Sequence, residues 1–216
     1  MKILNKIIAT TAITTLCATM SFAEGSSNYV PIKKGVKSIE MNLNGVEFTL
    51  KRNQESGNKI NELYNNTTFG APQPIKLAKG VETLGELEFI EYMKKAQNDD
   101  SIAIVDSRKP GWHAKLRIPG SINIPYTNFR TKEGAIEAME FDLGVSVKKD
   151  GTLDFSKAKT IVAYCNGYWC GQTPAMVKNV ENSLLNMGYP AKKIKYYRGG
   201  MQAWTSLGFT VVGSGK

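Results

Sequence analysis

Two cysteines stand close together in one segment of the chain, Tyr164-Cys165-Asn166-Gly167-Tyr168-Trp169-Cys170-Gly171-Gln172-Thr173-Pro174. The apolar residues 161–164 before it predict a buried strand, and residues 174–187 after it predict a helix with Thr173 as N-cap. Open α/β sheets bind ligands at such a junction of strand end and helix start. Loop N–H groups and the helix dipole there favour a thiolate. We therefore expect Cys165 to be a nucleophile whose substrate carries negative charge.

The strand and helix around this segment belong to a longer alternation. Residues 102–105, 122–124, 194–197 and 209–212 also read as strands, and helices are expected after Thr83, which with Glu86 resembles a capping box, and at residues 201–204. Strands that alternate with helices indicate an α/β fold with a mostly parallel sheet of about five strands.

A hairpin is expected before this alternation. Apolar and polar residues alternate on both sides of Asn44-Gly45, the strongest short hairpin signal, so residues 39–50 should pair with Leu43 opposite Val46. Residues 51–79 read as an irregular connection. We interpret residues 24–79 as an N-terminal extension without visible chemistry, and residues 80–216 as the main domain.

The first 23 residues have the parts of a secretory signal peptide. Lys2 and Lys6 make a basic start, residues 7–18 an apolar middle, and Ser21-Phe22-Ala23 a small-x-small cleavage site. We expect cleavage after Ala23 and a periplasmic or secreted protein. The apolar middle is too short to span a bilayer, so stable membrane insertion is not expected.

Composition excludes several other classes of protein. The 216 residues are 42% hydrophobic and 22% charged, which is typical of a globular domain rather than a repetitive or low-complexity chain. The formal charge of +9 comes from scattered basic residues, so no nucleic-acid partner is indicated. The sequence indicates no cofactor and no metal site.

Three ordered blocks of sequence resemble the rhodanese superfamily. They are Asp106-Ser107-Arg108 followed by Arg117-Ile118-Pro119-Gly120-Ser121-Ile122-Asn123-Ile124-Pro125, then Tyr164-Cys165 with its loop, then Arg198-Gly199-Gly200 with Trp204. The resemblance implies about five parallel strands flanked by helices. It also implies transfer of sulfur through a persulfide on Cys165.

The active-site loop departs from the pattern of that family. It is longer than usual, and Cys170 stands where the family often has an arginine, so phosphoryl chemistry is not expected. Arg117 stands where the family usually has histidine, and His113 is expected to pack or lie at the surface. The remaining loop residues, with Tyr168 and Trp169 as pocket walls, are Asn166, Gly167, Tyr168, Trp169, Gly171, Gln172 and Thr173.

Two arginines are candidates to attract an anionic sulfur donor. Arg198 and Arg108 each follow a predicted strand, so both should lie at the sheet edge that carries Cys165. Arg108 has a second interpretation, because it stands two residues from Asp106 and an ion pair would explain it. Trp204 is expected in the core, and Gly199-Gly200 in a tight turn before it.

Three hypotheses about function remain open. In the first, a periplasmic sulfurtransferase moves sulfane sulfur from thiosulfate or polysulfide to cyanide or a thiol, including a protein thiol. In the second, Cys165 and Cys170 cycle as a thiol-disulfide pair. In the third, the domain docks a partner without catalysis. Cys170 is either a resolving thiol that attacks the persulfide or an inert small residue.

Overall fold

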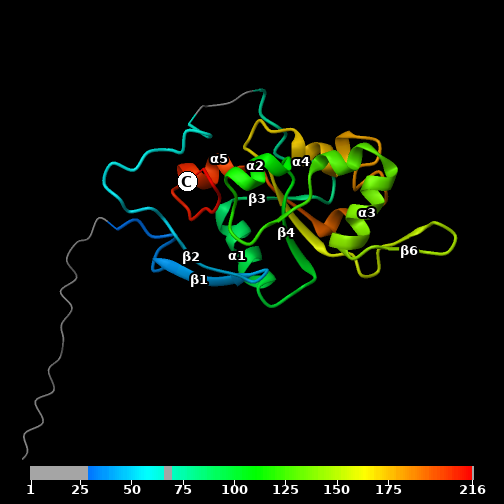
Figure 1. Cartoon of the computed structure of the whole chain (residues 1–216), viewed down its shortest axis with the longest axis horizontal. Helices are drawn as coiled ribbons and strands as arrows, with labels where there is room; N and C mark the ends of the chain where they lie inside the picture. The colour runs from blue at the N-terminus through cyan, green and yellow to red at the C-terminus, as the bar shows by residue number, and fades with distance from the viewer. Residues whose placement is uncertain (1–28, 66–69, 216) are drawn as a thin grey trace, which may run out of the picture.

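A five-stranded parallel sheet forms the centre of the protein. The computed structural model describes residues 29–65 and 70–215 (Figure 1). Its sheet has the order β3-β9-β8-β4-β5. The expected α/β class with about five parallel strands is confirmed. The strands of this sheet are β3 (Glu82–Leu84), β4 (Ile102–Asp106), β5 (Ile122–Asn123), β8 (Thr160–Tyr164) and β9 (Ile194–Tyr197).

One face of the sheet is covered by α1 (Glu86–Ala96), α5 (Gly200–Ser206) and an N-terminal hairpin. Because side chains alternate along a strand, Ile104, Val162 and Tyr197 point to this face, where they join Phe89 of α1 and Trp204 of α5 in one buried cluster. Trp204 is fully buried, as expected of a core residue. This layer therefore fixes the position of α5, which lies against the Cys165 loop.

The opposite face is covered by helical segments from the second half of the chain. Val105, Ala163 and Tyr196 point to this side and pack with Met139 and Val177. The remaining elements are α2 (Pro110–Lys115), η1 (Tyr126–Arg130), α3 (Lys132–Leu143), β6 (Ser146–Val147), β7 (Leu153–Asp154), α4 (Gln172–Pro174), η2 (Ala175–Asn179) and η3 (Ala191–Lys193). Strands β6 and β7 pair antiparallel in a small separate ribbon.

The N-terminal hairpin forms in the register that the sequence predicts. Strand β1 (Ser38–Leu43) pairs antiparallel with β2 (Val46–Lys51), with Leu43 opposite Val46. Asn44 and Gly45 both have positive φ, 51° and 74°, which is the geometry that Asn-Gly adopts most readily in a two-residue turn. The Asn44 side chain donates a hydrogen bond to the Gly120 carbonyl at 2.6 Å, so the turn is tied to the main domain.

The fifth strand of the sheet and the start of the first helix differ from expectation. Residues 209–212 form only isolated bridges, Phe209 with Arg52 and Val212 with Arg117, whereas β3 pairs with β9 at the edge. Thr83 lies in β3, and α1 begins after Gly85, with the Glu88 carboxylate accepting from the Gly85 N–H. The capping box predicted at Thr83 and Glu86 is therefore wrong, because Thr83 belongs to β3 and Gly85 is the N-cap of α1.

The helix expected over residues 174–187 is also wrong in its extent. Helical structure begins at Gln172, with Gly171 rather than Thr173 as N-cap, and ends at Asn179. Val180 has extended backbone, and the N–H of Leu184 returns to the carbonyl of Met176 at 2.9 Å. The Asn186 side chain donates to the Val180 carbonyl at 2.9 Å, and such a side-chain bond to the backbone competes with the helix and favours this break.

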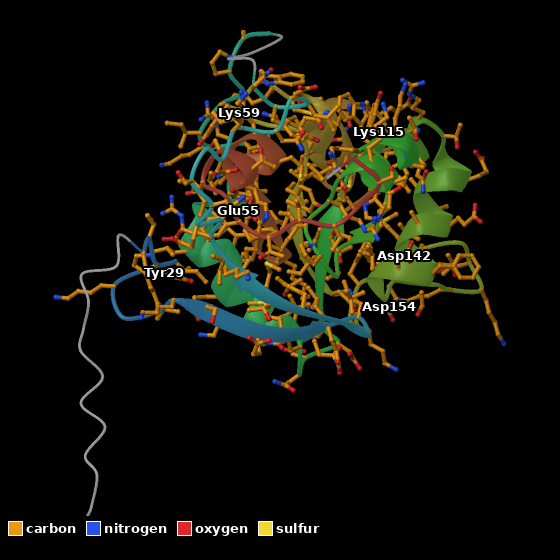
Figure 2. The ribbon with its side chains drawn as sticks, turned by 60° about the vertical axis from the view of Figure 1, so that its left-hand side comes forward. Tyr29, Glu55, Lys59, Lys115, Asp142 and Asp154 are labelled. Carbon is orange, nitrogen blue, oxygen red and sulfur yellow. The ribbon has the colours of Figure 1, made fainter. Side chains whose placement is uncertain are left out.

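Most of the extension follows the surface without regular structure. Figure 2 shows the segment that carries Glu55 and Lys59 running along the outside of the molecule. The proposed signal peptide, residues 1–23, lies outside the described residues. Among the residues that are described, no helix is both long and apolar enough to cross a membrane.

The hairpin supplies a matched test of packing. Leu43 is 1% exposed and its cross-strand partner Val46 is 39% exposed. We expect Leu43→Ala to lower the free energy of unfolding by about 2–5 kcal/mol, because it leaves a cavity in the core. Val46→Ala should change it by less than about 0.5 kcal/mol. Urea denaturation followed by circular dichroism measures both, and equal losses would show that the hairpin does not pack as described.

Candidate active site

Cys165 lies directly after the carboxyl end of β8, at the centre of the sheet. Its side chain is 1% exposed. The neighbours that surround the sulfur are polar. The thiol hydrogen can donate to the Cys170 carbonyl at 3.3 Å, and the donors that surround the sulfur come from Gly167, Cys170 and Thr173. The loop and the first turn of α4 therefore build a buried polar site rather than an apolar one.

Hydrogen bonds to the sulfur decide its charge. Burial raises the pKa of the Cys165 thiol, since a charged sulfur loses its hydration. The Cys170 thiol, the Thr173 hydroxyl and the N–H groups of Thr173 and Gly167 all favour the thiolate, and together they outweigh burial and lower the pKa to about 7. A large fraction of Cys165 is therefore a thiolate near neutral pH, and the thiolate is the nucleophilic form.

Cys170 is held beside Cys165 and stays protonated. Both cysteines are free and buried. The hydrogen bond to Cys165, burial and the negative charge of Cys165 all raise the pKa of the Cys170 thiol well above its usual value. The Cys170 N–H donates to the Gly167 carbonyl at 2.9 Å, a turn that folds the second cysteine back towards the first. The two thiols therefore lie within hydrogen-bonding distance of each other in the loop.

Backbone hydrogen bonds from the start of α5 hold the loop in place. The N–H groups of Met201 and Gln202 donate to the carbonyls of Cys165 and Asn166 at 3.0 and 2.8 Å. Gly200 has φ of +55°, and a Cβ there would lie 2.3 Å from the Cys165 carbonyl oxygen. Only glycine permits this approach of two backbones. The Gly199-Gly200 pair therefore forms the turn before α5 and lets its backbone contact the Cys165 loop.

Arg108 forms a buried ion pair rather than facing the loop. Its guanidinium contacts both Asp106 carboxylate oxygens, at 2.8 and 2.6 Å, and donates to the Leu116 carbonyl. The structure favours the ion-pair interpretation over a role in binding anions, because the guanidinium is completely buried. Burial alone would raise the pKa of Asp106, but hydrogen bonds from Arg108 and His113 hold it below its usual value. His113 contributes at 2.9 Å from the Asp106 carboxylate.

The ion pair reaches the loop through Asn166. One guanidinium nitrogen of Arg108 donates to the Asn166 side-chain oxygen at 3.2 Å and to the Tyr64 hydroxyl at 2.5 Å. The Tyr64 hydroxyl in turn donates to Asn166 at 3.2 Å. Burial, as the largest cause, raises the pKa of Tyr64 to about 12, so the hydroxyl keeps its proton. Asn166 is thereby fixed from two sides, directly after the cysteine.

Sequence reasoning missed the contribution of the extension to this site. Tyr64 belongs to the extension, and so does Gln73, whose N–H donates to the Tyr168 carbonyl at 2.7 Å. The Gln73 side chain also donates to the Trp169 carbonyl at 3.2 Å. The segment around these residues is rich in asparagine and proline and shows no periodicity. A tyrosine that becomes buried outside any regular element leaves no pattern that could have identified it.

The outer side of the loop carries Tyr168 and Arg198. Tyr168 is 40% exposed, and the Arg198 guanidinium lies over its ring at 5.2 Å. Arg198 is half-buried and donates from Nε to the Gln73 carbonyl at 2.8 Å. Trp169 is half-buried and Gly171 exposed, and both stand on the same outer side of the loop. The guanidinium of Arg198 therefore lies on the outer side of the loop, beside Tyr168.

Two polar atoms near the loop have no hydrogen-bond partner among the described residues. They are the Gln172 side-chain oxygen and the Tyr196 hydroxyl, and both are buried. Burial raises the pKa of Tyr196, and the negative charge of Cys165 raises it further, so the Tyr196 hydroxyl keeps its proton.

The Thr173 hydroxyl donates a hydrogen bond to the Cys165 sulfur, which gives a test. The hydroxyl oxygen of Thr173 also lies 2.7 Å from that of Ser107, whose O–H donates to the Tyr164 carbonyl at 2.8 Å. Removing the hydroxyl in Thr173→Val should raise the Cys165 pKa from about 7 towards the ordinary thiol value of about 8.5. The rate of alkylation by iodoacetamide at neutral pH should then fall several-fold, and its pH profile should shift upward.

The control for that experiment is Thr152→Val in an exposed turn. The profile of this variant should match the wild type. An unshifted profile in Thr173→Val would contradict the assigned role of the hydroxyl.

Comparison with known proteins places this site in a family. The model of the Rhodanese-like domain matches residues 89–207. A thiosulfate:glutathione sulfurtransferase of Saccharomyces cerevisiae is 28% identical over 133 residues, which cover 61% of this chain and 85% of that protein. Two solved structures also match. The BH2092 protein of Bacillus halodurans is 22% identical with a TM-score of 0.43, covering 63% of this chain and 80% of that one. An uncharacterized protein of Saccharomyces cerevisiae is 21% identical with a TM-score of 0.37, covering 58% and 92%.

The family match spans more than half of the chain, from the interior of α1 to the end of α5. It includes the strand β8 that precedes Cys165, the loop that surrounds the sulfur, and the first turn of α5, which is hydrogen-bonded to this loop. The chain therefore belongs to the rhodanese-like domain family.

Proposed function

We propose that this protein is a sulfurtransferase that carries sulfane sulfur as a persulfide on Cys165. The observation that carries the proposal is the buried sulfur surrounded by hydrogen-bond donors, with its pKa lowered to about 7. A structural cysteine has no need of such donors, whereas a nucleophile that must be charged at neutral pH depends on them. Family membership and the sulfurtransferase relative support the same assignment.

The first step is attack on the donor. The Cys165 thiolate attacks the outer sulfur of thiosulfate, the bond between that sulfur and the sulfite group breaks, and sulfite leaves with the electron pair. The new persulfide carries its negative charge on the outer sulfur. We propose that the N–H groups of Gly167 and Thr173, which stabilise the thiolate, also stabilise this anion.

The second step returns the enzyme to its starting state. A thiol acceptor takes the outer sulfur, and Cys165 leaves as a thiolate, for which its lowered pKa makes it a good leaving group. We propose a thiol acceptor ahead of cyanide, because the relative from yeast is named for the transfer of sulfur between thiosulfate and glutathione. Polysulfide is a second donor with the same terminal sulfur chemistry.

Access to Cys165 requires movement of the loop. The sulfur is 1% exposed, and Tyr168 and Trp169 lie outside it with their carbonyls tied to Gln73. We propose that the segment 166–170 opens to admit the donor and that Arg198 draws the anion to this opening. The guanidinium is positively charged and half-buried beside Tyr168.

The sequence also leaves open a docking module without catalysis and a thiol-disulfide redox protein. A docking module without catalysis gives no reason to lower the pKa of a buried thiol. A thiol-disulfide redox protein is favoured by one observation, the hydrogen bond between Cys170 and Cys165. We therefore retain the redox pair as the second candidate and the sulfurtransferase as the first.

We also propose that the protein is exported. Residues 1–23 have the pattern of a cleaved signal peptide. Export would place the two thiols in a compartment where disulfides persist. A mature chain that begins at Glu24 in the extracytoplasmic fraction would support the proposal, and a full-length chain retained in the cytoplasm would contradict it.

Persulfide formation is the direct test of the function. The reduced Cys170→Ser variant, treated with thiosulfate and then desalted, should gain the mass of one sulfur atom in intact-protein mass spectrometry. The added sulfur should map to Cys165, since this is the thiol with the lowered pKa. Cys165→Ser should gain none, and a gain of equal size in that variant would refute the assignment.

Arg198 gives a test of donor binding. Removal of a charge-assisted contact of about 1.5–3 kcal/mol in Arg198→Ala should raise the KM for thiosulfate roughly ten-fold or more, with a smaller effect on kcat. Arg198→Lys should recover part of the loss. Arg130, which also stacks over a tyrosine, is the matched control, and Arg130→Ala should leave KM unchanged. An unchanged KM in Arg198→Ala would exclude Arg198 from donor binding.

A further inference from the structure

The Cys170 thiol donates a hydrogen bond to the Cys165 thiolate but takes no covalent part in the transfer reaction. It lies in the same loop as Cys165, is equally buried at 1% exposure, and is folded back by the bond from its N–H to the Gly167 carbonyl. Its own carbonyl lies 3.3 Å from the Cys165 sulfur. Both thiols are free, and neither is a ligand of a metal cluster among the residues described. The loop therefore keeps a second thiol against the first.

The two thiols are unequal before sulfur is loaded. Cys165 carries the charge, and Cys170 keeps its proton because it donates a hydrogen bond to that charge. Cys170 thus does not compete for the donor. Cys165 is therefore the thiol that attacks the donor first.

Loading with sulfur reverses the relation between the two thiols. In the persulfide, the negative charge moves from the Cys165 sulfur to the outer sulfur, and the Cys165 sulfur becomes the centre of an S–S bond. The charge and the hydrogen bond that hold the proton on Cys170 are both weakened by this change. The inner sulfur is at the same time an electrophile, because a thiolate attacks the sulfur of an S–S bond.

We propose that Cys170 then attacks the inner sulfur of the Cys165 persulfide and expels hydrosulfide, so that the protein also reduces sulfane sulfur to sulfide. This activity rests on the proposed persulfide. The bond between Cys165 and the outer sulfur breaks, and a Cys165–Cys170 disulfide forms. The proton of Cys170 leaves with the outer sulfur as HS⁻. The outer sulfur leaves with the electron pair of the broken S–S bond, and Cys170 supplies the pair for the new one. Over loading and release together, the sulfane sulfur gains two electrons and the two cysteine sulfurs lose one each.

Renewed turnover needs an external dithiol, which reduces the disulfide by thiol exchange and returns both cysteines to the free state seen here.

The experiment follows sulfur and thiols together in the full mature chain. Reduced protein without free reductant is treated with thiosulfate under anaerobic conditions, and released sulfide, free thiols and intact mass are measured. The wild type should release one sulfide per chain, lose both thiols and lose the mass of two hydrogen atoms. Dithiothreitol should then restore both thiols. Cys170→Ser should keep the added sulfur and release no sulfide, and Cys170→Ala provides a second variant if serine disturbs the buried loop.

The outcomes separate this activity from the proposed function. Wild type that keeps a stable persulfide with a free Cys170 would overturn the inference while leaving the sulfurtransferase intact. Equal release of sulfide by wild type and Cys170→Ser would also overturn it. If neither the wild type nor either Cys170 variant acquires sulfur, and no sulfide appears, the proposed function itself fails.

Discussion

The site depends on one constraint, the need to keep a charged sulfur out of water. Desolvation opposes the Cys165 thiolate, and only hydrogen bonds from the loop can offset it. These bonds come from positions two, five and eight residues beyond the cysteine, Gly167, Cys170 and Thr173, so the whole loop must fold around the sulfur before any one donor helps. A short helical turn of eight residues follows, from Gln172 to Asn179. Individual donors therefore account for more of the stabilisation than a long helix dipole would.

A buried polar platform keeps this loop in place. The Asp106–Arg108 ion pair is completely buried, yet each partner has additional hydrogen bonds, which is the condition under which such a pair is tolerated. Tyr64 connects the pair to Asn166, and α5 holds the loop backbone from the other side. Asn166 therefore accepts hydrogen bonds both from Arg108 of the rhodanese-like domain and from Tyr64 of the extension.

The sequence was sufficient for features set by local patterns. The hairpin register follows from Asn44-Gly45 with alternating residues, and the central strands follow from short apolar runs. The sequence also placed Cys165 between a buried strand and a helix, and the structure has it directly after β8; its role as the nucleophile stays a prediction. The edge strand β3 was missed because three residues are too few to show a period. The prediction of a helix beyond Asn179 was wrong because the Leu184 N–H bonds to the distant Met176 carbonyl instead of to a carbonyl one helical turn before it. Tyr64 and Gln73 were missed because long-range contacts of irregular segments depend on the finished fold.

The central claim is that Cys165 is a thiolate at neutral pH, and the ultraviolet absorbance of thiolate titrated against pH tests it most directly. The wild type should show a titration with a midpoint of about pH 7 that is missing in Cys165→Ser. The Cys170→Ser variant should retain a thiolate step, because the serine hydroxyl can replace the hydrogen bond that the Cys170 thiol donates. A midpoint at or above the ordinary thiol value of about 8.5 would contradict the account, because the donors around the sulfur would then not outweigh its burial.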